Sequence, residues 1–402
     1  MVEPKIRVLV ISTMFPNPIQ PVYAVFVHRR LAHAASHCEY RVLAPIPFFP
    51  LSHLLLERYA IRRKIPKEAL YGNIPVQYPR FLSIPRLFKP LDGLFLFFTC
   101  WWHARKIRKT FPFDLIDSQL AFPDGFAAYL LSRIFKVPFT ITLRGHDVNH
   151  LPVFPVRRRQ ITLALKGAAR VMAVAEALRK AAVALGCPSK NTETIPNGVD
   201  RALFFPGDRS EARELLGLPR SSKVVLTVGH LVERKGHHLV VQALALMVAQ
   251  SSEELFLAIV GGPGEEGDLR ELIEGEVARL GLKSRVRLVG PVANEDLQPW
   301  FCAADLFCLA SSKEGWANVL LESLACGTPV VATNVWGTPE VICSPALGIL
   351  VDRTVESIAA GLLEGLKRTW DREELVLYAS RFTWEQVGAK VAENYRLALR
   401  LR

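Results

Sequence analysis

The sequence predicts an α/β protein with two domains, each built on a parallel sheet. Short apolar runs of strand length alternate with stretches of helical periodicity along nearly the whole chain. The alternation restarts after a loop-rich segment near residue 200, and 402 residues are more than one hydrophobic core usually holds. Parallel strands joined by helices are normally covered by helices on both faces of the sheet.

In the first half, apolar runs and helix-like stretches follow each other in order. We expect strands over residues 6–12, 40–44, 115–117 and 138–143. We expect helices over residues 25–35 and 125–135. The chain then passes through Asn-Gly and Pro-Gly pairs near residue 200, which are typical of loops.

The second half repeats this pattern. We expect strands over residues 223–229, 255–262, 285–290, 305–311, 328–333 and 348–351. We expect helices beginning near Gly236, Glu266, Asp296 and Trp316. The domains are therefore predicted at residues 1–200 and 201–380, both Rossmann-like, with a final helix at 381–402. Open sheets of this kind bind ligands at the carboxyl ends of their strands, so we expect a cleft where the two sheets face each other.

The positive charge is concentrated in the first half. Residues 1–200 contain 28 Lys or Arg and 12 Asp or Glu, a formal charge of +16, whereas the remainder contains 22 and 26, a charge of −4. A basic domain suggests an anionic partner, such as a membrane surface, a phosphorylated lipid or nucleic acid. The alternative is an Arg-rich surface that only meets solvent.

The seven cysteines form no C-x-x-C pair, and several stand in apolar runs. This pattern argues against a disulfide framework or a zinc site and favours the reducing cytoplasm. The apolar run at the N-terminus is too short for a signal peptide. Residues 91–102 are the most apolar later stretch, but they fall short of the roughly 20 residues that span a bilayer.

Two common nucleotide-binding fingerprints are absent from the sequence. Neither half has G-x-G-x-x-G after its first strand, which disfavours a nicotinamide or flavin enzyme. There is also no P-loop, which disfavours a Walker-type ATPase.

The segment LTVGHLVERKGHH places Arg234 and Lys235 between a predicted strand and a predicted helix. Two adjacent cations beside a helix N-terminus suit a diphosphate. The alternative is a solvated basic pair on a loop. Gly261 and Gly262 lie in another turn after a strand, where glycine lets a ligand approach the backbone.

Glu314 and Glu322 have seven residues between them in SSKEGWANVLLESLACGTPVV. A helix over these eight steps rises about 12 Å, which resembles the distance from a nucleotide ribose to a sugar on its diphosphate. The helix N-terminus between them favours phosphate. Alternatively, Glu314 is an ordinary acid at a helix start and Glu322 an exposed helix residue. However, Glu322 interrupts the apolar run VLLESLA, which speaks against a solvated position.

Five segments in this order resemble the retaining glycosyltransferases of family 4, also called group 1. They are FPNPIQPVYAVFVHRRLA, FPDGFAAYLLSRIFKVPFTITLRGHDVN, TIPNGVDRALFFPGD, VGHLVERKGHHLVVQAL and EGWANVLLESLACGTPVVATNVWGTPEVI. The last contains the E-x7-E motif of the family as Glu314 and Glu322. The resemblance covers nearly the whole chain and implies the GT-B architecture, with the C-terminal helix packing back toward the N-terminal domain.

The resemblance also implies roles for individual residues. Arg234 and Lys235 would neutralise the donor diphosphate, Glu322 would bind the ribose, and Glu314 would contact hydroxyls of the donor sugar. His146, in LRGHD, would reach that sugar from the N-terminal domain. Asp147 would hold the His146 loop or simply cap the next segment. Backbone N–H groups would support sugar and phosphate at Gly315, Trp316, Ala317, Asn318 and Val319. Asn197 and Gly198 would shape the hinge.

One position departs from the family pattern. The family usually has glycine two residues before the F of its N-terminal loop, where this chain has Ala24. Alanine is expected there only with a negative φ, so the role of this loop in approaching phosphate or acceptor is in doubt.

The reaction that the resemblance implies is transfer of a hexose-type sugar with retention of configuration. The donor is a nucleoside-diphosphate sugar, UDP or GDP, and the diphosphate oxygen helps to deprotonate the acceptor. No D-x-D motif occurs, so we expect neither a bound metal nor a cofactor. The alternative enzyme is a sugar-nucleotide epimerase, since some share this architecture.

The acceptor is expected on the basic N-terminal domain. Residues 81–109 mix aromatic residues with Arg and Lys, as in segments that lie in an anionic membrane interface. A buried helix with a basic outer face is the alternative. We therefore expect a cytoplasmic enzyme, peripheral on the membrane, whose acceptor is a lipid-linked saccharide or polysaccharide of the cell envelope or for export. A nucleic-acid partner is disfavoured, because no recognisable binding module occurs and the second half is acidic.

Overall fold

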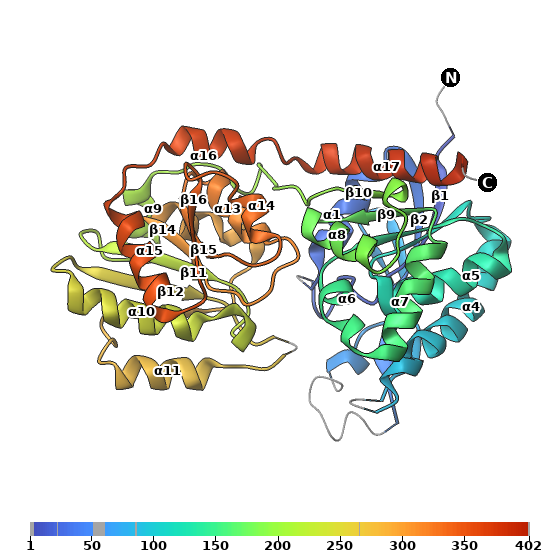
Figure 1. The fold of residues 1–402 in the computed structure, drawn as a ribbon, viewed down its shortest axis with the longest axis horizontal. Helices are drawn as coiled ribbons and strands as arrows, with labels where there is room; N and C mark the ends of the chain where they lie inside the picture. Colours follow the sequence, from blue (N-terminus) through green and yellow to red (C-terminus); the bar gives the residue numbers. More distant parts are fainter. Residues whose placement is uncertain (1–3, 22, 51–60, 85–86, 265, 401–402) are drawn as a thin grey trace. The chain divides into compact units, whose positions relative to one another are not determined.

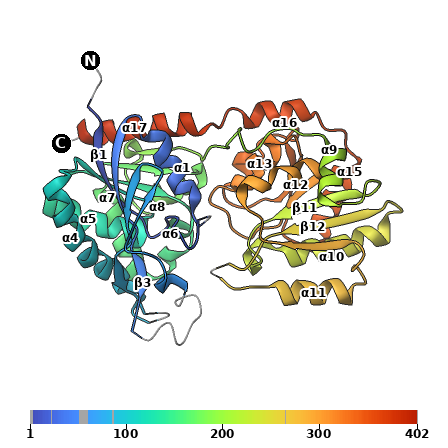
Figure 2. The same ribbon diagram turned by 180° about the vertical axis from the view of Figure 1, so that it is seen from behind.

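The computed structural model describes residues 4–21, 23–50, 61–84, 87–264 and 266–400. The chain forms two compact units (Figures 1 and 2). Unit 1 consists of Met1–Asn197 and Trp384–Arg402, and unit 2 of Gly198–Thr383. The sequence had suggested boundaries at residues 200 and 380.

Unit 1 is built on an eight-stranded sheet with the order β10-β9-β8-β7-β1-β2-β5-β4, in which only the β4–β5 pair is antiparallel. Its strands are β1 (Ile6–Ile11), β2 (Cys38–Leu43), β4 (Glu68–Tyr71), β5 (Ile74–Gln77), β7 (Leu115–Ser118), β8 (Phe139–Leu143), β9 (Arg170–Ala173) and β10 (Thr192–Thr194). A separate pair is formed by β3 (Ile46–Phe48) and β6 (Arg80–Leu82). The predicted parallel sheet is therefore confirmed, with one antiparallel edge added.

Helices of unit 1 pack around this sheet, with α1 against α17 and with α4, α5 and α7 packed in sequence. The α-helices are α1 (Val25–Ala34), α4 (Asp92–Thr110), α5 (Phe126–Phe135), α6 (His146–Asn149), α7 (Pro155–Gly167), α8 (Glu176–Ala184) and α17 (Trp384–Arg400). Short helical turns are η1 (Lys89–Leu91), η2 (Ala121–Gly125), η3 (Leu151–Val153) and η4 (Ser189–Asn191).

The antiparallel edge comes from a hairpin that the alternation pattern did not predict. Strands β4 and β5 are joined by a two-residue turn at Gly72 and Asn73, and Gly72 has a φ of +55°. A Gly-Asn pair between two short apolar runs is a hairpin signal, so the sequence did contain the information.

The C-terminal helix belongs to the N-terminal unit, as expected. Trp384, Val387, Val391 and Tyr395 of α17 join the buried cluster formed by β1, β2 and α1. Figures 1 and 2 both show α17 lying along α1. The two helices approach closely at Gly388, where a Cβ atom would lie 2.4 Å from the backbone carbonyl of His33.

The expectation for Ala24 was wrong. Ala24 precedes α1 with φ 50° and ψ 33°, the left-handed conformation that glycine adopts without strain. Its side chain is buried in the core of unit 1. The alanine therefore keeps the glycine-like backbone geometry, at a conformational cost of about 1–2 kcal/mol.

Unit 2 contains a six-stranded parallel sheet with the order β13-β12-β11-β14-β15-β16. Its strands are β11 (Lys223–Val228), β12 (Leu255–Val260), β13 (Val286–Gly290), β14 (Leu306–Leu309), β15 (Val330–Thr333) and β16 (Gly348–Val351). The order runs outward from β11 in one direction and from β14 in the other. The direction of winding thus reverses between β11 and β14, which is where open α/β sheets bind ligands.

Two groups of helices cover this sheet: α10, α11 and α15 pack together, and so do the pairs α9 with α12 and α13 with α16. The helices are α9 (Arg209–Leu216), α10 (His237–Gln250), α11 (Arg270–Arg279), α12 (Gln298–Ala303), α13 (Asn318–Ala325), α14 (Thr338–Val341), α15 (Val355–Lys367) and α16 (Arg372–Ala379), with short turns η5 (Glu233–Lys235) and η6 (Asn294–Asp296).

Within residues 81–109, α4 agrees with the alternative of a helix with one buried face, while contact with a membrane stays a prediction. One face of the helix is buried, through Leu96, Cys100 and Ala104, while Phe98 and Trp102 are 59% and 56% exposed. Across the described part of the chain, no helix is long and apolar enough to cross a membrane.

Replacing a helical glycine by alanine should have opposite effects on the free energy of unfolding at Gly388 and at Gly275. Gly388→Ala should lower the free energy of unfolding by about 1–3 kcal/mol, because the new methyl group would overlap the α1 backbone. Gly275→Ala, in α11 where a Cβ meets no atom within 4 Å, should raise it by about 1 kcal/mol. Urea unfolding of both variants measures the two changes. A neutral or stabilising Gly388→Ala would contradict the close approach of the two helices.

Candidate active site

Two loops of unit 2 meet at the point where the sheet reverses its winding. The first follows β11 and contains the turn η5 with Arg234 and Lys235, and the second follows β14 and contains Glu314. Gly236, with φ +72°, ends the first loop, and a Cβ there would lie 2.2 Å from the carbonyl oxygen of Ala310. Only glycine fits this position, which holds the two loops in backbone contact.

The two loops join through a compact ionic cluster. Lys235 Nζ lies 2.6 Å from Glu314 Oε1, and the Ser311 hydroxyl donates a hydrogen bond of 2.7 Å to the same oxygen. Arg234 lies 3.8 Å from Glu314 and forms a closer ion pair of 2.9 Å with Glu266. The Glu314 side chain is only 9% exposed and that of Lys235 13%, so little water screens this pair.

Burial alone would raise the pKa of the Glu314 carboxyl. The charges of Lys235 and Arg234 and the hydrogen bonds from Lys235 and Ser311 outweigh that effect, so the pKa lies below its usual value and the carboxylate stays ionised at neutral pH. For Arg234, burial lowers the pKa, but the hydrogen bond to Glu266 and the charges of both glutamates raise it overall. The cluster is therefore two cations balanced by two carboxylates.

Three residues at this site were not predicted from the sequence: Ser311 and Glu266 in the cluster, and Arg353 beside it. Arg353 donates hydrogen bonds to the carbonyl oxygens of Ala310 (3.0 Å) and Glu233 (2.8 Å), and so connects the same two loops. Glu266 stands in the glycine-rich turn after β12, whose acidic residues could have suggested a partner for a nearby cation. Nothing in the periodicity identified Ser311 or Arg353.

Glu322 occupies the middle of α13, and it is only 7% exposed. The alternative of an exposed helix residue is therefore wrong. The expected 12 Å of helical rise between Glu314 and Glu322 is also wrong, because α13 begins at Asn318 and Glu314 lies in the preceding loop. Only the four residue steps from Asn318 to Glu322 are helical, a rise of about 6 Å.

The N-terminus of α13 follows Ala317, whose methyl side chain cannot cap the helix by a hydrogen bond. Its first N–H groups, with those of the loop from Gly315, are thus in the position expected for contacts to phosphate and sugar, although the ligand contacts themselves stay a prediction. Trp316 and Ala317 are buried, and the Trp316 ring lies 5.8 Å from that of Phe382. The contact between Trp316 and Phe382 therefore holds this loop in place.

His237, the first residue of α10, is a buried neighbour of the cluster that the sequence did not single out. Burial and the charge of Lys235 lower its pKa to about 4, so the ring is neutral at physiological pH. Its nitrogens lie 3.1 Å from the Thr227 hydroxyl and 3.2 Å from the His230 carbonyl oxygen. These contacts fix the ring beneath the loop that carries Arg234 and Lys235.

A backbone contact that the sequence did not predict requires glycine at Gly261. A Cβ at this position would lie 1.8 Å from the carbonyl oxygen of Gly229, so the loops after β12 and β11 touch through their backbones. The carbonyl of the next residue, Gly262, accepts a hydrogen bond from Leu231 N. Contact of Gly261 and Gly262 with a ligand remains a prediction.

Two of the remaining candidates, His146 and Asp147, lie in unit 1 after β8. Asp147 is buried and accepts hydrogen bonds from the backbone N–H groups of Ala121 (2.8 Å) and Gly145 (3.0 Å), which confirms that it holds this loop. Gly145 has a φ of +133°. His146 follows it, is exposed, and has its ring 4.7 Å from that of His150. Asn197 and Gly198 lie on either side of the boundary between the units.

The lowered pKa of Glu314 predicts a pH-dependent contribution to stability. A carboxyl whose pKa is depressed by folding stabilises the protein above its unfolded value of 4.5, and this contribution is lost as the pH falls through the folded value. Glu314→Gln should therefore lower the free energy of unfolding by about 1–3 kcal/mol at pH 7, and by less below pH 4.5.

Chemical denaturation of both proteins at several pH values measures this difference. Glu266→Gln is the matched control, because Glu266 also pairs with Arg234 but its side chain is 53% exposed. A constant difference between wild type and Glu314→Gln across the pH range would contradict an ionised, buried Glu314.

Comparisons with known proteins identify the family of the chain. The family Glycosyl transferases group 1 matches residues 208–382, and Glycosyltransferase Family 4 matches residues 56–203. A D-inositol 3-phosphate glycosyltransferase of Thermobispora bispora is 36% identical over 224 residues, which are 53% of this chain and 52% of that protein. The chain thus spans about half the length of such curated relatives. The putative teichuronic acid biosynthesis glycosyltransferase TuaC of Bacillus subtilis is 25% identical, over 89% of this chain and 88% of that protein.

Solved structures share the fold over nearly the full length. The sucrose-phosphate synthase of Thermosynechococcus elongatus superposes with a TM-score of 0.76 at 21% identity, covering 99% of this chain and 100% of that chain. Anabaena HepE in complex with UDP-glucose gives a TM-score of 0.70 at 22% identity, covering 97% of this chain and 99% of that chain. With two family matches that together run from residue 56 to residue 382, and with the GT-B fold, the chain belongs to the group 1, family 4 glycosyltransferases.

Proposed function

We propose that the protein is a retaining, metal-independent glycosyltransferase that transfers a hexose-type sugar from a nucleoside-diphosphate sugar to a lipid-linked or saccharide acceptor. The observation that supports this most is the cluster of Arg234, Lys235 and Glu314 at the reversal point of the sheet in unit 2. It joins two diphosphate-binding cations to a carboxylate that can bind sugar hydroxyls.

The charge balance of the cluster suggests how the donor is accommodated. Both cations are already paired with carboxylates, so an incoming diphosphate has to replace Glu314 on Lys235 and compete with Glu266 for Arg234. The displaced Glu314 then becomes available to accept hydrogen bonds from the donor sugar. One carboxylate thereby serves in turn as the ion-pair partner of Lys235 and as a ligand of the donor sugar.

The reaction requires charge stabilisation more than a protein base. As the glycosidic bond to the diphosphate breaks, negative charge grows on the leaving oxygen, beside Arg234 and Lys235. That oxygen accepts the proton of the acceptor hydroxyl, which attacks from the same face of the sugar and so retains its configuration. Glu322 holds the ribose, and His146 supports the donor sugar.

Similar proteins support the choice of donor and of pathway. Anabaena HepE was solved with UDP and with UDP-glucose, which supports a UDP-sugar, with GDP-sugar as the other expected donor. TuaC is named as a putative glycosyltransferase of teichuronic acid biosynthesis, which supports a role in cell-envelope or exported polysaccharide synthesis.

Nucleotide release tests the proposed reaction directly. The purified protein, incubated with UDP-, GDP- or ADP-sugars with and without a membrane lipid extract, should release nucleoside diphosphate from one donor, and more so with lipid. The double variant Arg234→Ala, Lys235→Ala should lower turnover by about 100-fold or more, because the leaving diphosphate loses both cations. Isomerised sugar nucleotide in place of free diphosphate would indicate an epimerase instead.

Nucleotide affinity tests the role of Glu322 separately. Glu322→Ala should weaken binding of the preferred nucleoside diphosphate by about tenfold, the loss expected when a charged hydrogen-bond acceptor is removed. Glu253→Ala, an exposed glutamate at the end of the α10–β12 connection, is the matched control. Equal affinities of the two variants, measured by titration calorimetry, would exclude the ribose contact.

Association with an anionic membrane is the second part of the proposal. Exposed apolar side chains stand among cations just before η1, on α4, in η3 and just before α7: Leu87, Phe88, Phe98, Trp102, Val153 and Phe154. Lys106 lies over the ring of Trp102 and Arg157 over that of Phe154, at 5.1 and 4.7 Å. The Gln160 amide donates to the Pro90 carbonyl oxygen (3.0 Å), which links α7 to η1. Aromatic rings next to cations suit a membrane interface.

Vesicle sedimentation tests this surface. The double variant Phe98→Ser, Trp102→Ser should bind phosphatidylglycerol vesicles about tenfold or more weakly, since each exposed aromatic loses roughly 1.5–3 kcal/mol of burial. The matched control is Leu215→Ser, Leu377→Ser, which removes apolar side chains that are 73% and 61% exposed on unit 2. Equal losses in both double variants would exclude a specific role for α4.

A further inference from the structure

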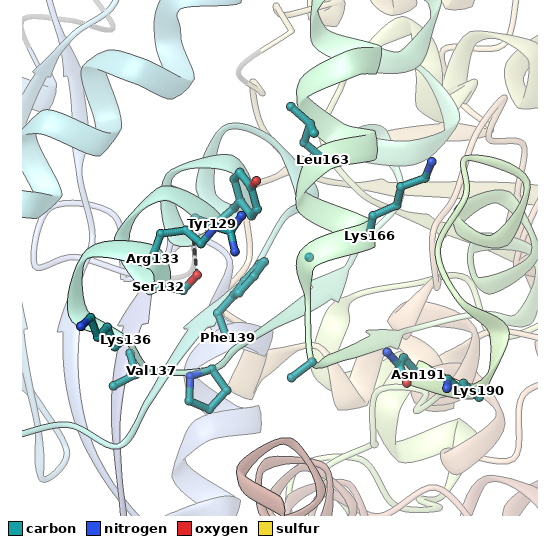
Figure 3. A pocket seen from close by; sticks show the side chains of 13 residues that line it. Tyr129, Ser132, Arg133, Lys136, Val137, Phe139, Leu163, Lys166, Lys190 and Asn191 are labelled. Carbon is teal, nitrogen blue, oxygen red and sulfur yellow. Dashed lines mark hydrogen bonds between the residues drawn. The ribbon is translucent and has the colours of Figure 1, made fainter. Parts of the chain in front are cut away.

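A pocket of about 780 Å³ opens on unit 1 at a place that the proposed transfer reaction does not use (Figure 3). Its walls come from the end of α5, the turn into β8, the end of α7 and the turn η4 before β10. Tyr129 and Phe139 contribute aromatic rings to its wall, and Val137 and Leu163 add aliphatic side chains (Figure 3).

The pocket lies at the opposite end of the sheet from His146. Phe139 in its wall is the first residue of β8, whereas the chain reaches the His146 loop after Leu143, the last residue of that strand. Five strand residues span about 16 Å. The pocket is therefore a separate feature of unit 1, at the amino ends of strands whose carboxyl ends carry the candidate active-site loop.

Four cations line the pocket: Arg133, Lys136, Lys166 and Lys190. No Asp or Glu is among the residues that line it. Within the described ranges, no ion pair joins Arg133, Lys166 or Lys190 to a carboxylate. A cavity lined by one sign of charge focuses the electrostatic potential and attracts the opposite charge.

Two of the cations, both exposed, lie against neighbouring parts of the pocket wall. The Arg133 guanidinium lies 5.6 Å from the centre of the Tyr129 ring, and a Cβ at Gly167 would lie 2.7 Å from the same ring. The end of α7 is thus packed against the ring that supports Arg133. Similarly, Gly186 lies so close to Lys166 that a Cβ there would be 2.7 Å from its Cε. A side chain at Gly167 or Gly186 would therefore occupy the space that Tyr129 and Lys166 fill in the wall of the pocket.

We propose that this pocket binds a ligand carrying at least two phosphate groups. An Arg guanidinium can bind a phosphate through two parallel hydrogen bonds, and lysines add point charges around it. The volume is in the range of small-molecule sites and is much larger than a single inorganic ion needs. Tyr129 and Phe139 provide a surface for the uncharged part of the ligand. The ligand is either soluble, such as a diphosphate or phosphorylated saccharide, or the headgroup of an anionic lipid.

The first experiment measures binding of inorganic pyrophosphate by titration calorimetry. Because the cluster in unit 2 is itself a proposed diphosphate site, the protein used is the Arg234→Ala, Lys235→Ala variant, which removes those cations. We expect one pyrophosphate per chain. Adding Arg133→Ala and Lys166→Ala should weaken binding by about tenfold or more, since charge-assisted hydrogen bonds are lost.

The matched control removes an Arg and a Lys that lie outside the pocket. Arg368 lies over the ring of Trp370 at 4.5 Å, as Arg133 lies over Tyr129, and Lys367 next to it is exposed. Adding Arg368→Ala and Lys367→Ala to the same background should leave pyrophosphate binding unchanged. Equal weakening by both pairs would mean that only net charge matters, and would overturn the proposal.

The second experiment separates the two sources of phosphate. Wild type and the Arg133→Ala, Lys166→Ala variant are compared on phosphatidylcholine vesicles with and without phosphatidic acid. Loss of vesicle binding in the variant, without pyrophosphate binding in the first experiment, assigns the site to a lipid headgroup. Pyrophosphate binding that depends on Arg133 and Lys166 assigns it to a soluble ligand. If neither depends on these residues, the pocket is not a phosphate site.

Discussion

The backbone contact between two strand-end loops of unit 2 is the constraint on which the candidate site depends. Gly236 lets the loop after β11 rest on the carbonyl of Ala310 after β14, and Arg353 connects the same two loops through hydrogen bonds. This contact brings Lys235 within 2.6 Å of a carboxylate 79 residues away. A side chain at Gly236 would push the two loops apart and so separate Lys235 from Glu314. The ionic cluster therefore depends on glycine at this one position.

Much of the fold could be predicted from the sequence, because apolar runs and helical periodicity are local signals. The alternation of strands and helices, the parallel sheets and the C-terminal helix on unit 1 were expected and are confirmed, whereas β9, β10, α7 and α8 of unit 1 were not among the predicted elements. The β4–β5 hairpin was missed because its strands are short and only partly buried. Ala24 was misjudged because the rule for alanine is statistical, and the surrounding core can stabilise a left-handed residue.

The site could be predicted as a set of residues but not as an arrangement. Motif positions identified Arg234, Lys235, Glu314 and Glu322, since residue type and spacing survive in the sequence. Which carboxylate pairs with which cation depends on loop conformation, which has no periodicity. Ser311 and Arg353 could not be identified for the same reason. The position of Glu314 relative to α13 could not be predicted either, because it depends on the residue at which α13 begins.

The ion pair between Lys235 and Glu314 also makes this carboxylate a competitor of any anion that binds Lys235. If a nucleoside diphosphate has to displace Glu314 before it can bind Lys235, the carboxylate disfavours any diphosphate that does not bring a sugar to occupy it in return. Once the sugar has left, Glu314 can return to Lys235 and help to expel the product. Discrimination between intact donor and spent nucleotide would then follow from a single carboxylate with two alternative partners.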